Sequence, residues 1–180
     1  EDRATLAPVA VANGGTDPTE ITVTTFGVPS EPEPAGGNGY QIRRSYFDLD
    51  GQPASPETVA AGTRLVAVIE VTPFGRQEAR LMVNDPLPAG FEMDNPSLLR
   101  SGDIGALDWL ETVSAESTEF RADRFLAAVD WRSDRTFRLA YIVRAVTPGT
   151  YRQPAASVED MSRPQMRART EAGQVTVTGG

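Results

Sequence analysis

Alternation of apolar and polar residues with a period of two is the feature that most constrains the fold of this chain. Such a pattern is typical of β-strands with one buried face. It is clearest in the stretch 137–145, where one face would carry Phe137, Leu139, Tyr141, Val143 and Ala145. The run Leu65–Ile69 is apolar on both faces, which indicates a central strand covered on both sides. Further strands are expected at Leu6–Ala12, Ile21–Val28, Tyr40–Phe47, Ala79–Val83, Phe125–Trp131 and Gln174–Thr178.

The segments between these strands contain residue types that favour turns. Asn13-Gly14-Gly15 and Asp48–Gly51 have the Asn, Asp and Gly residues that favour tight turns. Residues 29–39 are rich in Pro and Gly, and we expect them to form a surface loop. Apolar residues at helical spacing predict a short helix near 103–111, within a helical insert at 101–118 that packs on the strands. The sequence therefore predicts a single all-β domain over residues 1–180, an antiparallel β-sandwich of about eight strands.

Three residue types are missing, and their absence limits the chemistry. The 180 residues include no Cys and no His, and the 17 basic residues are all Arg. Disulfides, thiolate metal sites, Ser-His-Asp triads and lysine Schiff bases are thereby excluded. We expect no catalytic residue, no metal site and no cofactor in this chain, which is predicted not to be an enzyme.

The net charge of −8 is unevenly distributed. An acidic chain is a poor ligand for nucleic acid, so we expect no nucleic-acid partner. Residues 121–180 carry 10 Arg against 6 acidic residues. This basic third is either a docking surface or a set of solvent-facing Arg residues that balance nearby acids.

With Cys, His and Lys absent, paired carboxylates are the remaining candidates for catalytic residues. Asp48/Asp50 and Glu159/Asp160 are close in sequence and could supply the acid and the ionised partner of a glycoside hydrolase, and Asp48/Asp50 could also belong to a calcium loop. However, neighbouring acids in a strand point to opposite faces, and Asp48–Gly51 has the composition of a hairpin tip. Both pairs are therefore weak candidates.

Aromatic residues and one methionine offer binding alternatives. Four aromatics, which could form a platform for sugar or belong to the core, are Phe125, Trp109, Trp131 and Tyr141. Met161 lies in the polar, Pro-broken segment 158–164, where a thioether has no obvious core to enter. It either tucks under its loop or is presented to a partner.

Several stretches together resemble one known family. They are Asp85–Glu92, Ser101–Leu107, Glu119–Phe125, Ala140–Thr150 and Val158–Met161. These stretches are similar to the C-terminal macroglobulin-like domain of bacterial alpha-2-macroglobulins. The resemblance implies an immunoglobulin- or macroglobulin-like β-sandwich that is a non-catalytic part of a protease-trapping endopeptidase inhibitor.

The resemblance also implies partners and a site. The domain would dock on the thioester domain of the same polypeptide, and Met161 would shield the thioester, with Glu159, Asp160 and Ser162 as further interdomain contacts. Ser162 stands where the family has Tyr. Trapped proteases and a penicillin-binding peptidoglycan synthase are the other partners that the family suggests.

The expected location also depends on the resemblance. The chain starts at Glu1 and contains no apolar run of membrane-spanning length, so any targeting signal or lipid anchor would lie upstream. We expect a periplasmic lipoprotein held at the inner membrane by that anchor. The alternative function is an extracytoplasmic adhesive or carbohydrate-binding module that uses the aromatic residues.

Overall fold

The computed structural model describes residues 10–22, 24, 31–76, 78–94, 97, 99–100, 103, 105–107 and 110–179. The chain divides into two compact units, Glu1–Ser30 and Glu31–Gly180. In the first unit, Asn13 forms the predicted turn: its Oδ1 accepts the Gly15 N–H at 2.8 Å, and its Nδ2 donates to the Asp17 carbonyl at 2.7 Å.

Strands were predicted on both sides of that turn, and the described residues do not form them. Residues 10–12, 21, 22 and 24 are exposed and belong to no strand. The prediction is wrong there because these residues bury no apolar face. The remaining residues of Leu6–Ala12 and Ile21–Val28 lie outside the described part of the chain.

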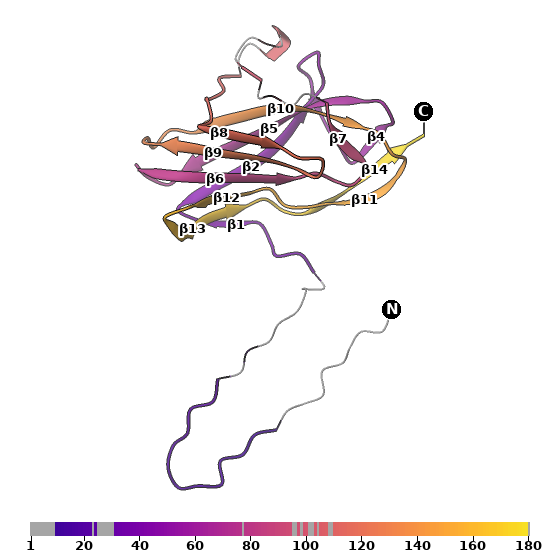
Figure 1. Cartoon of the computed structure of the whole chain (residues 1–180). Helices are drawn as coiled ribbons and strands as arrows, with labels where there is room; N and C mark the ends of the chain where they lie inside the picture. The colour runs from indigo at the N-terminus through magenta and orange to yellow at the C-terminus, as the bar shows by residue number, and fades with distance from the viewer. Residues whose placement is uncertain are drawn as a thin grey trace. The chain divides into compact units, whose positions relative to one another are not determined.

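The second unit is a β-sandwich whose first sheet has six strands in the order β1-β13-β12-β6-β9-β8 (Figure 1). All neighbours in this sheet are antiparallel. Its strands are β1 (Gly36–Asn38), β6 (Ala79–Pro86), β8 (Ser117–Phe120), β9 (Arg124–Trp131), β12 (Ser157–Asp160) and β13 (Arg163–Arg169).

A five-stranded antiparallel sheet, in the order β3-β2-β5-β10-β7, forms the other layer. Its strands are β2 (Tyr40–Phe47), β3 (Pro53–Ala54), β5 (Arg64–Pro73), β7 (Phe91–Met93) and β10 (Phe137–Ala145). A third sheet contains β11 (Gly149–Gln153), β14 (Gly173–Thr178) and β4 (Thr58–Ala60), of which β14 and β4 pair in parallel. The sequence predicted fewer strands than the structure has, because most of the others are short and the seven-residue β13 carries no alternating apolar pattern.

The main core lies between the sheets and confirms the predicted alternation. Along β10, the five apolar residues at odd positions from Phe137 to Ala145 are at most 1% exposed and belong to one cluster with Leu81, Val83 and Phe125. Along β5, Leu65, Ala67 and Ile69 join the same cluster.

A second apolar cluster covers the opposite face of the five-stranded sheet. Val66 and Val68 on β5 pack there with Ala140 and Ile142 of β10, under Leu99, Leu107 and Leu110 of the insert. The prediction of a central strand at Leu65–Ile69 covered on both sides is therefore confirmed.

The described residues of the insert over this face include little helix. Of the helix predicted near 103–111 they form the 3₁₀ turn η1 (Gly105–Leu107), and residues 101, 102, 104, 108 and 109 lie outside the described part. The Leu99 and Val113 N–H groups donate to carbonyls of β10 at 2.8 and 3.0 Å. These two bonds attach the residues on either side of the predicted helix to the edge of β10. The predicted 101–118 insert also overlaps the start of β8.

The predicted loop at 29–39 contains one strand. Gly36–Asn38 forms β1, which pairs with β13, and residues 31–35 are irregular. Gly37 fits there because an added Cβ would lie 2.1 Å from the Tyr40 carbonyl oxygen and 2.8 Å from Ala168. In the described part of the chain, no helix is long and apolar enough to cross a membrane.

Candidate functional site

Met161 lies at the tip of the hairpin between β12 and β13. It forms a two-residue connection with Ser162, at the end of the sandwich where β6 and β13 begin. The Met161 N–H donates to the Arg80 carbonyl at 2.9 Å, yet 51% of the residue is exposed. The backbone is therefore fixed while the apolar side chain faces solvent.

Asp160 anchors this turn from below. Its residue is fully buried, its Oδ1 accepts the Ser162 N–H at 2.9 Å, and its Oδ2 accepts the Arg163 Nε–H at 2.7 Å. The Arg163 Nη2 also lies 2.7 Å from Oδ2 and donates to the Glu78 carbonyl at 3.3 Å. Charge-assisted hydrogen bonds of this kind hold a turn more firmly than neutral ones. Asp160 thus sets the position of Met161.

Tyr40 completes the buried side of the turn. Its residue is fully buried, and its hydroxyl has no hydrogen-bond partner among the described residues. Burial raises the pKa of Tyr40, the Asp160 charge raises it further, and Arg163 acts in the opposite direction. The phenol therefore stays neutral beneath the Asp160–Arg163 pair.

A register shift interrupts the pairing of β12 with β13 beside the turn. Glu159 pairs with Arg167, whereas Asp160 pairs with Arg163, so residues 164–166 bulge out of β13. Met166 of the bulge packs over Gly39, which has a φ of +83° and no room for a Cβ. Bulges of this type redirect side chains at sheet ends.

The four predicted contact residues therefore occupy different environments. Met161, Glu159 and Ser162 are exposed, and Glu159 lies on the outer face of the sheet. Asp160 is buried, and its carboxylate anchors the turn. Its role as an interdomain contact stays a prediction.

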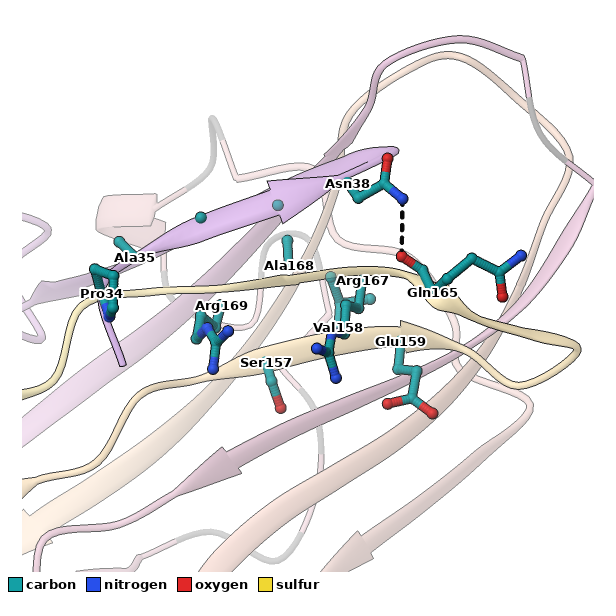
Figure 2. Close-up of a pocket in the computed structure, with 12 residues that line it drawn as sticks. Pro34, Ala35, Asn38, Ser157, Val158, Glu159, Gln165, Arg167, Ala168 and Arg169 are labelled. Atoms are coloured by element: carbon teal, nitrogen blue, oxygen red, sulfur yellow. Dashed lines mark hydrogen bonds between the residues drawn. The ribbon is translucent and has the colours of Figure 1, made fainter. Parts of the chain in front are cut away.

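A surface groove of about 610 Å³ runs beside the turn, between β1, β12 and β13. Figure 2 shows Ser157, Glu159, Arg167 and Arg169 projecting to the same side of the strands, and the Asn38 amide donating to the Gln165 carbonyl at 2.9 Å.

Among the described Arg residues of the basic third, several are paired with acids: Arg121, Arg124, Arg138, Arg144, Arg163 and Arg169. This pairing favours the interpretation that they balance nearby acids.

A buried polar network in the core was not predicted from the sequence. Asp85 of β6 is fully buried, pairs with Arg44 of β2, and accepts a hydrogen bond from the Tyr141 hydroxyl of β10. Arg44 also donates to the Pro154 carbonyl at 2.8 Å. Burial raises the pKa of Asp85, whereas the Arg44 charge and the bonds from Tyr141 and Arg44 lower it. The sequence signal that could have revealed this network is Asp85, a charged residue at the next core-facing position of the strand after Leu81 and Val83.

The carboxylate pairs do not form a catalytic or metal centre. Asp48 caps a tight turn, where its Oδ1 accepts the Gln52 N–H at 2.8 Å and Gly51 has a φ of +79°. Glu159 and Asp160 point to opposite faces, as expected. Within the described residues, no group of three or more acids could hold a metal ion.

The aromatic residues do not form a sugar-binding platform where they are described. Phe125 and Tyr141 are fully buried and pack with ring centroids 4.6 Å apart. Trp131 packs on Phe137 at 4.9 Å and donates to the Arg135 carbonyl at 3.1 Å. Trp109 lies outside the described residues. The alternative of a carbohydrate-binding module loses its main support.

Comparisons with known proteins point to one family. Residues 39–165 match the bacterial alpha-2-macroglobulin MG10 domain. An alpha-2-macroglobulin of Xylella fastidiosa (strain 9a5c) is 32% identical over 98% of this chain, which corresponds to 11% of the relative.

Solved structures agree with the sequence match. The crystal structure of Salmonella alpha-2-macroglobulin reacted with methylamine has a TM-score of 0.75 and 34% identity, over 84% of this chain and 10% of that one. Trypsin-activated alpha-2-macroglobulin from Escherichia coli has a TM-score of 0.74 and 32% identity, over 84% of this chain and 11% of that one. The chain thus spans about a tenth of the length of these relatives. Because the family match covers residues 39–165, well over half of the sequence, the chain belongs to the bacterial alpha-2-macroglobulin MG10 domain family.

Proposed function

We propose that this chain is a non-catalytic terminal domain of a protease-trapping alpha-2-macroglobulin that docks on the thioester domain of the same polypeptide. In that position Met161 would shield the thioester from water and amines. One observation carries the proposal: Met161 is half-exposed, although its backbone is fixed to Arg80 and its turn is anchored by buried Asp160.

The physical argument concerns the stability of the reactive bond. A thioester persists only where water and amines are excluded, and an apolar side chain on a fixed turn is suited to exclude them. This chain has no Cys, so the reactive bond would lie elsewhere in the polypeptide. Reaction of the Salmonella relative with methylamine and activation of the Escherichia coli relative by trypsin support the assignment.

The activity, the location and a further partner of the full protein are proposed on the same basis. The full protein would inhibit endopeptidases by trapping them, in the periplasm, and a lipid anchor upstream of this domain would hold it at the inner membrane. A penicillin-binding peptidoglycan synthase is proposed as a partner of the full protein. Fractionation of cells that express the full-length protein tests the location.

Substitution of Met161 tests the shielding role in the full-length protein. Loss of a buried Met contact costs roughly 1.5–3 kcal/mol, and about 1.4 kcal/mol corresponds to a tenfold change in an equilibrium. We therefore expect Met161→Ala to speed inactivation of the thioester by methylamine by about tenfold or more. The measurement is the rate of thiol release during the reaction.

Two controls make the test specific. Met161→Leu keeps an apolar side chain of similar volume and should retain a rate close to that of the unmodified protein. Arg121→Ala removes an exposed side chain from the β8–β9 turn, at the opposite end of the sandwich, and should leave the rate unchanged. An unchanged rate for Met161→Ala would refute the shielding role.

A further inference from the structure

Phe74 is a second exposed apolar side chain on the β-sandwich. It lies in the turn between β5 and β6, where 66% of the residue is exposed. Among the described residues of 31–179, the large apolar side chains with such exposure are Phe74 and Met161. The Phe74 N–H donates to the carbonyl of Gly39, between β1 and β2, at 3.0 Å, but its ring is exposed and adds little to the core.

Phe74 and Met161 lie on neighbouring turns. β5 ends at Pro73 and β6 begins at Ala79, beside the end of β12, where Leu81 pairs with Asp160. Two hydrogen bonds link these segments: the Met161 N–H donates to the carbonyl of Arg80 at the start of β6, and Arg163 at the start of β13 donates to the carbonyl of Glu78 in the Phe74 turn. Figure 1 shows β6, β12 and β13 meeting at this end of the sandwich.

Charged residues lie in and beside both turns. Arg76 and Glu78 are exposed in the turn that carries Phe74, and Arg163, which is partly exposed, follows the turn of Met161. An apolar centre with a charged rim is typical of contact surfaces in proteins. The two turns therefore have the composition of one small contact surface.

The size of this surface indicates what covers it. A fully buried Phe contributes about 150–250 Å², whereas a stable complex of separate proteins needs roughly 1,000 Å² or more. A contact this small is effective when the partner is tethered, because the effective concentration within one polypeptide is high. The relatives are about ten times longer than this chain, so such tethered partners exist in the family.

We propose that Phe74 is a second apolar contact of the surface that carries Met161, and that the thioester domain of the same polypeptide covers both turns. This inference rests on the proposed function. Phe74 would strengthen docking of the domain, whereas Met161 would cover the thioester itself.

The test uses the full-length protein with Phe74→Ala, Met161→Ala and the double variant. We expect Phe74→Ala to speed methylamine inactivation by about threefold to tenfold, because one exposed contact is lost. The double variant should react faster than either single variant. Phe74→Leu should restore a slow rate, and Arg121→Ala is the matched exposed control.

The outcomes separate this inference from the proposed function. Faster reaction of Met161→Ala alone, with Phe74→Ala unchanged, would overturn the role of Phe74 and leave the shielding role intact. Unchanged rates for both would overturn both. A photo-crosslinker at position 74 should form a bond with the thioester domain; a bond with a second protein molecule instead would also overturn the inference.

Discussion

Two arginine–carboxylate pairs each bury the carboxylate, but their arginines lie in different surroundings. Asp85 and Arg44 are 41 residues apart on strands of different sheets, and their side chains are 0% and 6% exposed. Asp160 and Arg163 are three residues apart at a hairpin tip, where the arginine side chain is 41% exposed. The first pair joins the two layers of the sandwich, and the second orders a single surface turn.

The difference indicates how charge is used in each region. In the core, loss of one partner leaves an uncompensated buried charge, which affects the stability of the whole domain. At the turn, solvent can reach Arg163, so loss of its partner costs less and acts mainly on the position of Met161. The core pair is therefore expected to govern folding, and the turn pair docking.

The largest effect is expected from Asp85→Ala. Removal of the carboxylate leaves Arg44 buried without its counter-charge and removes the acceptor for the Tyr141 hydroxyl. We expect the free energy of unfolding to fall by roughly 3–5 kcal/mol. Urea unfolding of the 180-residue chain, followed by circular dichroism, measures this change.

A double variant sharpens the interpretation of the core pair. Arg44→Met with Asp85→Leu replaces both charges by apolar side chains, and we expect it to be less destabilising than Asp85→Ala alone. If Asp85→Ala changes the unfolding free energy by no more than a surface substitution, the core pair does not hold the layers together.

A smaller loss of stability is expected from Asp160→Asn. The variant keeps the size of the side chain but loses the charge that binds Arg163, so the unfolding free energy should fall by roughly 1–2 kcal/mol. The turn that holds Met161 should also become less ordered. In the full-length protein we therefore expect faster methylamine inactivation, measured at a temperature where the variant is fully folded.

Neighbouring Glu159 provides the control for this variant. Glu159→Gln makes the same chemical change on an exposed side chain and should alter stability by no more than about 0.5 kcal/mol. If Asp160→Asn lost stability with no change in the methylamine rate, Asp160 would support only the fold.

The smallest effect is expected from Ser162→Tyr. The turn uses the Ser162 backbone N–H rather than the exposed hydroxyl, so the turn should tolerate a larger side chain. A Tyr there would add apolar surface next to Met161, as the family resemblance suggests. We expect unchanged stability and a methylamine rate about twofold to threefold slower in the full-length protein; a faster rate would contradict a shared shielding surface.

The sequence predicted much of the fold where one residue pattern dominates. The alternation along 137–145 identified the buried face of β10, and the doubly apolar run Leu65–Ile69 identified a strand covered on both sides. Of the helix expected near 103–111, the described residues form the 3₁₀ turn Gly105–Leu107, and Leu107 and Leu110 cover a face of the sheet. Strand β1 was missed because Gly-Gly-Asn has no pattern.

The candidate site stays a prediction, and the structure adds the surroundings of its residues. The sequence singled out Met161 as an apolar residue in a polar segment, and the structure places it half-exposed at a fixed turn. Asp160 was grouped with it as a contact, although its carboxylate is buried. Phe74 was not predicted as part of the site, because the sequence alone does not show whether an apolar residue after a strand is exposed or buried.

By itself, the sequence determined the β class, the faces of the long strands, and the absence of thiol, imidazole and primary-amine side chains. Only the tertiary structure decided that Arg44 neutralises Asp85 and that Phe74 lies on the turn next to that of Met161. The physical reason is that a period of two specifies the side of a strand on which a residue lies. The order of strands in the sheets then determines which distant residues become neighbours.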